Sequence, residues 1–173
     1  MKKYIITDPC YILPDTEWDK CCEIFDSVAY KKAVEDRDFE KQNELFDTEA
    51  TSALRKYSGD YKACACSTGF GDWTNAIWGK NVLKHDFFAD SGMVCVCELT
   101  ETIQKHIDKD SSGDNKFNGM AVFETDADIA IDFDMTERDW TVVIITDKHT
   151  DEILITSEYA TCDDEDEEED EDE

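Results

Sequence analysis

The sequence predicts an α+β fold, in which two or three helices pack on a largely antiparallel sheet and a disordered acidic tail follows. The C-terminal third holds four apolar β runs joined by short polar connections, the pattern of an antiparallel meander. Apolar residues recur at helical spacing after residue 15. Residues 163–173 are all Asp or Glu, and such a run repels itself and buries nothing. We therefore expect one α+β domain over 1–162 and a disordered tail over 163–173.

The N-terminal part reads as a strand followed by helices. Residues 4–7 are apolar and are stopped by Asp8-Pro9, since the residue before a proline avoids the helical region. A helix then begins with Asp15 or Thr16 as N-cap. Its buried stripe is Trp18, Cys21, Cys22 and Phe25. Residues 30–57 are highly charged, and they predict one or two surface helices or a partly ordered insertion.

After residue 60, the spacing of apolar residues changes from the helical period to every second residue, as in a strand. Strands are predicted over 61–67 and 87–99. A short amphipathic helix follows over 99–108, with Thr100 as the candidate cap and with Ile103 and Ile107 facing inward.

The four C-terminal β runs cover 118–125, 127–135, 140–147 and 152–159. In the second run, Ile129, Ile131 and Phe133 alternate strictly with Ala130, Asp132 and Asp134, so one face meets solvent or a partner. The third run is apolar on both faces and belongs in the middle of the meander.

Two Cys-x-Cys pairs, Cys64/Cys66 and Cys95/Cys97, admit three interpretations. Zinc binding is disfavoured because residues i and i+2 of a strand lie about 6.6 Å apart, too far for two ligands of one ion. Redox chemistry is disfavoured because no Cys-x-x-Cys opens a helix. We favour two adjacent, central strands that are covered on both faces and whose thiols pack as small apolar groups.

Two further groups of residues could bind a cation. Asp108, Asp110 and Ser112 match the first half of a calcium loop, but Lys116 and Gly119 break its second half, which favours a turn. Asp8, Asp72 and Asp90 each stand beside turn residues at strand ends and could converge in a pocket. They would then bind a divalent cation or, as we favour, accept hydrogen bonds from backbone turns.

Three short motifs resemble a family of uncharacterised small phage and bacterial proteins. They are the strand ending in Asp8-Pro9-Cys10-Tyr11, a Gly-rich turn with Gly71 and Asp72, and the turn Asp90-Ser91-Gly92. The motifs fall discontinuously within residues 4–99. The resemblance implies a compact β-rich domain of phage or bacterial origin, and it implies no reaction.

The charge of the chain bears on its partners. The sequence carries 44 acidic and 17 basic residues, and residues 163–173 supply 11 of the acids, so the body is acidic too. Such a surface repels nucleic acid and anionic lipid and suits a basic protein partner. No apolar run reaches the length of a membrane span and no leader pattern begins the chain, so we expect a cytoplasmic protein without a cofactor.

These observations predict a non-enzymatic acidic interaction protein, with nucleic-acid mimicry as one way to inhibit a host protein. Its interaction residues would be Asp126, Asp128, Asp132, Asp134, Glu137 and Asp139. One alternative is a small cation-dependent hydrolase or ligand-binding protein that uses the pocket of Asp8, Asp72 and Asp90. Another is a virion or assembly component. The oligomeric state is not predicted.

Overall fold

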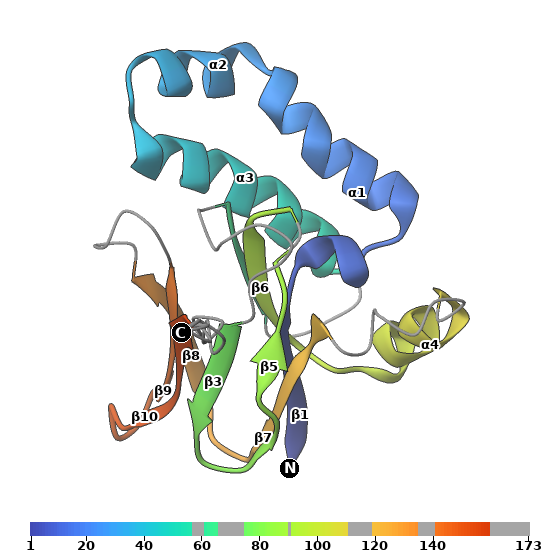
Figure 1. The fold of residues 1–173 in the computed structure, drawn as a ribbon, viewed down its shortest axis with the longest axis vertical. Coiled ribbons are helices and arrows are strands. Elements are labelled where there is room, and N and C mark those ends of the chain that lie inside the picture. The colour runs from blue at the N-terminus through green and yellow to red at the C-terminus, as the bar shows by residue number, and fades with distance from the viewer. Residues whose placement is uncertain (57–60, 66–74, 90, 111–118, 135–140, 160–173) are drawn as a thin grey trace, which may run out of the picture.

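In the computed structural model, the described residues form two five-stranded antiparallel sheets and four α-helices (Figure 1). The structure describes residues 1–56, 61–65, 75–89, 91–110, 119–134 and 141–159. The predicted α+β class is confirmed. The predicted tail, 163–173, lies outside the described residues.

Sheet A has the strand order β2-β6-β1-β7-β4. Its strands are β1 (Lys2–Thr7), β2 (Tyr61–Ala65), β4 (Val82–Lys84), β6 (Met93–Glu98) and β7 (Ala121–Thr125). The interior strands β1 and β6 are apolar on both faces, which is typical of strands covered from both sides.

Sheet B has the order β5-β3-β10-β9-β8. Its strands are β3 (Asn75–Gly79), β5 (Asp86–Phe87), β8 (Ile129–Asp134), β9 (Val142–Asp147) and β10 (Ile153–Tyr159). Strands β4 and β5 are separated by His85 alone, so one bent segment leaves sheet A and enters sheet B. The His85 carbonyl accepts a hydrogen bond from the Ile77 N–H at 2.9 Å, which continues the pairing with β3 through the bend.

The space between the sheets is one apolar core. Its centre is the stacked pair Tyr4 and Phe123, whose ring centroids lie 5.3 Å apart. Sheet A also contributes Ile6, Val94, Val96 and Ala121, and sheet B contributes Ile77, Phe87, Ile129, Val143, Ile145, Leu154 and Ile155. The two sheets therefore depend on each other for burial.

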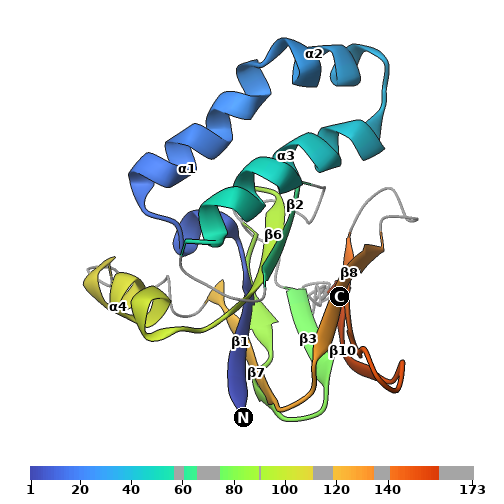
Figure 2. The ribbon, with the colours of Figure 1, turned by 180° about the vertical axis from the view of Figure 1, so that it is seen from behind.

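Three of the four described helices pack on the other face of sheet A, and the second helix packs on the third (Figures 1 and 2). They are α1 (Asp15–Cys22), α2 (Val28–Glu35), α3 (Phe39–Leu54) and α4 (Glu101–Asp110), with short 3-10 turns η1 (Pro9–Tyr11) and η2 (Glu23–Asp26). Phe46, Ala50 and Leu54 of α3 are buried against Cys95 and Cys97 of β6. Residues 39–54 therefore form part of the core layer, although they are rich in charge.

The local signals for α4 are confirmed, and those for α1 are confirmed in part. The Thr100 Oγ1 accepts a hydrogen bond from the Ile103 N–H at 3.3 Å, and Ile103 and Ile107 are buried. Helix α1 begins at Asp15, but its N-cap is Pro14, which has no side-chain hydrogen bond to offer. Cys21 is buried, as the predicted stripe requires.

The predicted four-strand meander is divided between the two sheets. All four runs form strands, but β7 pairs with β1 and β4 in sheet A, whereas β8, β9 and β10 form a three-strand meander in sheet B. The reason lies in burial: Val122 packs toward the helices while Ala121 and Phe123 enter the inter-sheet core. A strand covered on both faces belongs in sheet A, and the one-sided strand β8 does not.

The prediction for the cysteine pairs is confirmed in part: Cys95 and Cys97 are buried among apolar residues, but one of the two strands is not central. Strands β2 and β6 are adjacent, but β2 is the first strand in the order and is therefore not central. The register opposes Cys95 to Ala63, Cys97 to Tyr61 and Cys64 to Val94, so no cysteine lies opposite another. Cys66 lies outside the described residues.

Candidate functional site

Asp8 is a buried carboxylate at the end of β1. Its Oδ1 accepts a hydrogen bond from the Cys10 N–H at 2.9 Å. Its Oδ2 accepts two, from the Ser91 N–H and the Ser91 Oγ–H, each at 2.6 Å. Next to it, the Thr7 hydroxyl donates to the Gly119 carbonyl at 3.0 Å. Asp8 therefore fastens the turn after β1 to the segment that enters β6.

Burial raises the pKa of Asp8, and the hydrogen bonds from Ser91 and Cys10 oppose that rise. Both carboxylate oxygens already have protein donors, which is how buried turn residues satisfy neighbouring backbone groups. This geometry supports the structural role over a cation-binding one for Asp8. Asp72 and Asp90, the other residues of the predicted pocket, lie outside the described residues.

The described buried thiols are poor nucleophiles. Burial raises the pKa of Cys21 to about 11 and raises the pKa of Cys95 and of Cys97 further above the ordinary value. Because the thiolate is the reactive form, these cysteines stay protonated and inert near neutral pH.

The predicted calcium loop begins inside a helix. Helix α4 continues to Asp110, and the Asp108 Oδ1 accepts a hydrogen bond from Gln104 at 2.8 Å. Ser112 lies outside the described residues. Within the described ranges, no three His, Cys, Asp or Glu residues are grouped so that they could hold a metal ion.

Two of the predicted interaction residues, Asp126 and Asp128, are ion-paired within the protein. Asp126 contacts the N-terminal ammonium of Met1 at 2.8 Å, which raises the pKa of that ammonium. Asp128 contacts Lys148 at 2.9 Å, and this hydrogen bond lowers the pKa of Asp128. Their charges are partly balanced, and they lie in the connection from β7 to β8.

Asp132 and Asp134 lie on the outer face of sheet B, as the alternation predicts. The opposite face of β8 turns Ile129, Ile131 and Phe133 toward the inter-sheet core. Asp132 is exposed and Asp134 is partly exposed. Glu137 and Asp139 lie outside the described residues.

The two sheets differ sharply in charge. The strands of sheet A carry Lys2, Lys3, Lys62 and Lys84 together with Glu98 and Glu124. Lys2 pairs with Glu98 at 3.2 Å and Lys3 with Glu124 at 3.4 Å. The strands of sheet B contain no Lys or Arg, and their acids are Asp86, Asp132, Asp134, Asp147 and Glu158.

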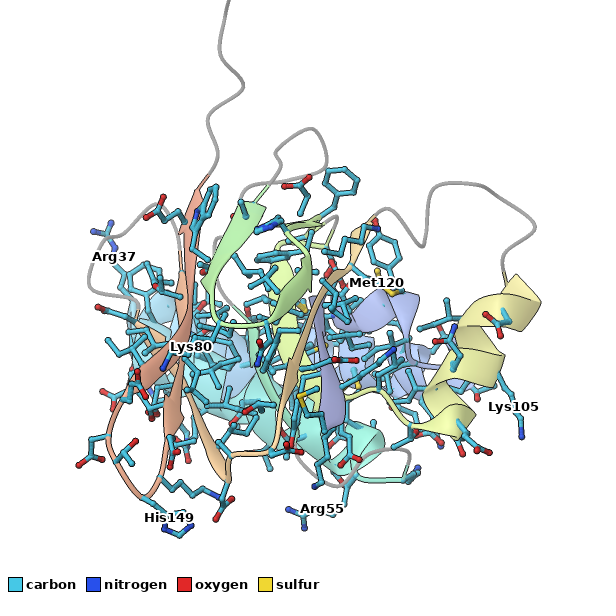
Figure 3. The ribbon with its side chains drawn as sticks, turned by 90° about the horizontal axis from the view of Figure 1, so that it is seen from below. Arg37, Arg55, Lys80, Lys105, Met120 and His149 are labelled. Carbon is cyan, nitrogen blue, oxygen red and sulfur yellow. The ribbon has the colours of Figure 1, made fainter. Side chains whose placement is uncertain are left out.

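Basic side chains lie next to sheet B, and Lys84, just before the bend into β5, attracts Asp86. Lys80, in the turn between β3 and β4, pairs with Glu152 beside β10, and His149 lies at the tip of the β9–β10 connection (Figure 3). Lys105 lies in α4, Arg55 is the C-cap of α3, and Arg37 lies in the turn between α2 and α3 (Figure 3). The strands of sheet B therefore supply acids, and no Lys or Arg, to its outer face.

Sequence reasoning missed the other half of this face. Trp78 of β3 is 51% exposed, and Asp86 of β5 and Glu158 of β10 are exposed as well. The apolar run of Ala76, Ile77 and Trp78 is the available signal, but it is too short to distinguish a strand from a loop. Only the pairing of β3 with β10 brings Trp78 beside the meander.

Comparisons with known proteins do not add a family. No protein-family model, no curated protein and no solved structure matches the chain. In the parts of the chain that the structure describes, no helix is both long and apolar enough to cross a membrane.

Proposed function

We propose that the protein is a non-enzymatic interaction protein that binds a basic protein partner through the outer face of sheet B. The observation that carries the proposal is the charge difference between the sheets: the strands of sheet A carry four lysines and two glutamates, and the strands of sheet B carry acids but no Lys or Arg. An acidic surface attracts a basic one during diffusion and selects against acidic partners.

The apolar content of the face supports binding over mere solubility. Val142 and Ile144 of β9 lie on the outer side and are partly exposed, and Ile153 is 59% exposed. A sheet face that only met water would carry polar residues at such positions. Apolar residues bordered by charge are typical of a surface that a partner covers.

The helices leave this face open. In both ribbon views, no described helix lies against the outer side of sheet B (Figures 1 and 2). The core contacts agree, because α1, α3 and α4 enter the cluster on the outer side of sheet A. One way to use the open face is to occupy the nucleic-acid-binding surface of a phage-host protein, since rows of carboxylates present negative charge as phosphates do.

The test is a charge-neutralised face with a matched control. The face variant combines Asp86→Asn, Asp132→Asn, Asp134→Asn and Glu158→Gln. The control removes equal charge from exposed helical acids through Glu23→Gln, Glu35→Gln, Glu40→Gln and Glu49→Gln. The probe is a fluorescein-labelled peptide of alternating arginine and lysine, titrated with full-length protein at low and physiological salt.

The wild-type protein is expected to bind the peptide, and more weakly as salt rises. Exposed ion pairs contribute about 0.2–1 kcal/mol each, so losing four weakens binding by roughly fourfold or more. The helical control should lose much less. Residues 163–173 are common to both variants, so the difference reports on the face. Equal losses in the two variants would contradict the proposal.

A further inference from the structure

We infer that the outer face of sheet B carries an arginine-selective docking point centred on Trp78. The inference rests on the proposed function and names the partner chemistry of the same surface. The partner is a basic protein segment that inserts an arginine over the Trp78 indole.

The register places Trp78 at the end of a row that crosses four strands. Asp132 of β8 opposes Ile144 of β9, Ile144 opposes Thr156 of β10, and Thr156 opposes Trp78 of β3. Neighbouring strands lie about 4.8 Å apart, so the row spans roughly 14 Å. A carboxylate thus stands at one end of the row and an aromatic ring at the other.

Two further carboxylates flank Trp78. Glu158 and Asp86 both oppose Ala76, two residues before Trp78, from the strands on either side. Each is therefore a diagonal cross-strand neighbour of Trp78, at about 7–8 Å, which is within reach of long and aromatic side chains. A cation over the indole would lie between two acids.

His85 holds the indole in place. The His85 and Trp78 ring centroids lie 5.4 Å apart at 48°, and the His85 Nδ1 lies 3.0 Å from the Ile77 carbonyl oxygen. The indole is half-exposed, yet it is braced by a neighbour that is tied to the backbone. A pre-positioned aromatic side chain loses little conformational freedom on binding.

This arrangement favours arginine over lysine. Trp is the strongest aromatic partner for a cation, and a guanidinium stacks flat on the ring while its edge donates hydrogen bonds to carboxylates. A lysine ammonium is a strongly hydrated point charge and cannot do both. A second copy of this chain is a poor occupant, because it would oppose one acidic face with another.

The experiment compares oligo-arginine and oligo-lysine peptides of equal length, each labelled with fluorescein. They are titrated with the full-length wild-type protein, Trp78→Ala and Trp78→Leu, where the leucine variant keeps apolar bulk in case the alanine variant is unstable. Phe39→Ala is the matched control, since Phe39 is an exposed aromatic residue at the start of α3.

The wild-type protein is expected to bind oligo-arginine about two- to fivefold more tightly than oligo-lysine, the range of an exposed cation–aromatic contact. Both Trp78 variants should bring that ratio close to one while oligo-lysine binding stays nearly unchanged, and Phe39→Ala should leave the ratio intact. Equal binding of the two peptides by the wild-type protein, or a ratio that survives both Trp78 variants, overturns the inference but not the proposed function. If neither peptide binds the wild-type protein, both fail.

Discussion

Asp8 offers the sharpest test of how the fold uses its buried charge. The substitution Asp8→Asn keeps the size of the side chain and removes its charge. Its carbonyl oxygen can still accept the Cys10 N–H, but its amide group faces the Ser91 N–H, which loses its acceptor. One buried backbone donor without an acceptor costs about 1–3 kcal/mol, which is the loss in the free energy of unfolding expected at acidic pH.

The stability difference between the wild-type protein and Asp8→Asn should shrink as the pH rises. Because burial raises the pKa of Asp8 above its ordinary value of 3.8, the native state holds the proton more tightly than the unfolded state does. The wild-type protein therefore loses stability as the pH rises from below 3.8 through the raised pKa, and Asp8→Asn has no such loss. Each unit by which the pKa of Asp8 is raised narrows the difference between the unfolding free energies of the two proteins by about 1.4 kcal/mol.

The assay is urea unfolding of the wild-type protein, Asp8→Asn and Ser91→Ala at a series of pH values. Ser91→Ala removes one hydrogen bond that opposes the rise in pKa, so it should extend the pH range over which stability falls. Groups that titrate in all three proteins cancel in the differences. The reasoning would be refuted if the difference in unfolding free energy between the wild-type protein and Asp8→Asn stayed constant or widened as the pH rises.

Two other predictions concern the framework. Gly79 has φ +149°, and a Cβ there would lie 2.0 Å from the Leu154 carbonyl oxygen, so Gly79→Ala should lower the free energy of unfolding by at least about 1–3 kcal/mol. The neighbouring Lys80→Ala breaks only an exposed ion pair and should cost less than about 1 kcal/mol in the same urea titration. Cys95 and Cys97 should resist iodoacetamide in the native protein at mildly alkaline pH and react after unfolding, as followed by peptide mass spectrometry. Native labelling at the unfolded rate would contradict their burial.

The sequence predicts correctly those helices and strands whose capping residues and apolar spacing lie within the element itself. Helix α4 follows from the Thr100 cap and the spacing of Ile103 and Ile107, and β8 follows from its strict alternation. The division of the C-terminal strands does not follow in the same way. Strand β7 enters sheet A because it pairs with β1, near the opposite end of the chain, and adjacency in sequence favoured the meander instead.

The candidate site was predictable only on the side that β8 supplies. Asp132 and Asp134 face outward because their neighbours in the strand are apolar. Trp78, Asp86 and Glu158 come from three other elements, and the pairings of β10 with β3 and of β3 with β5 bring them together. The partner of Asp8 was hidden for the same reason, since Ser91 lies far along the chain.

The position of Trp78 depends on the residue that follows it. Gly79 opposes Ile155 of β10, and its missing side chain lets β3 come close to the Leu154 carbonyl. The next segment then turns at Asn81 and bends at His85 from sheet A into sheet B. The segment from Gly79 to His85, which joins the two sheets, therefore also places the indole beside Glu158 and Asp86. A substitution that destabilises this segment should weaken arginine selectivity before it weakens the general attraction to basic peptides.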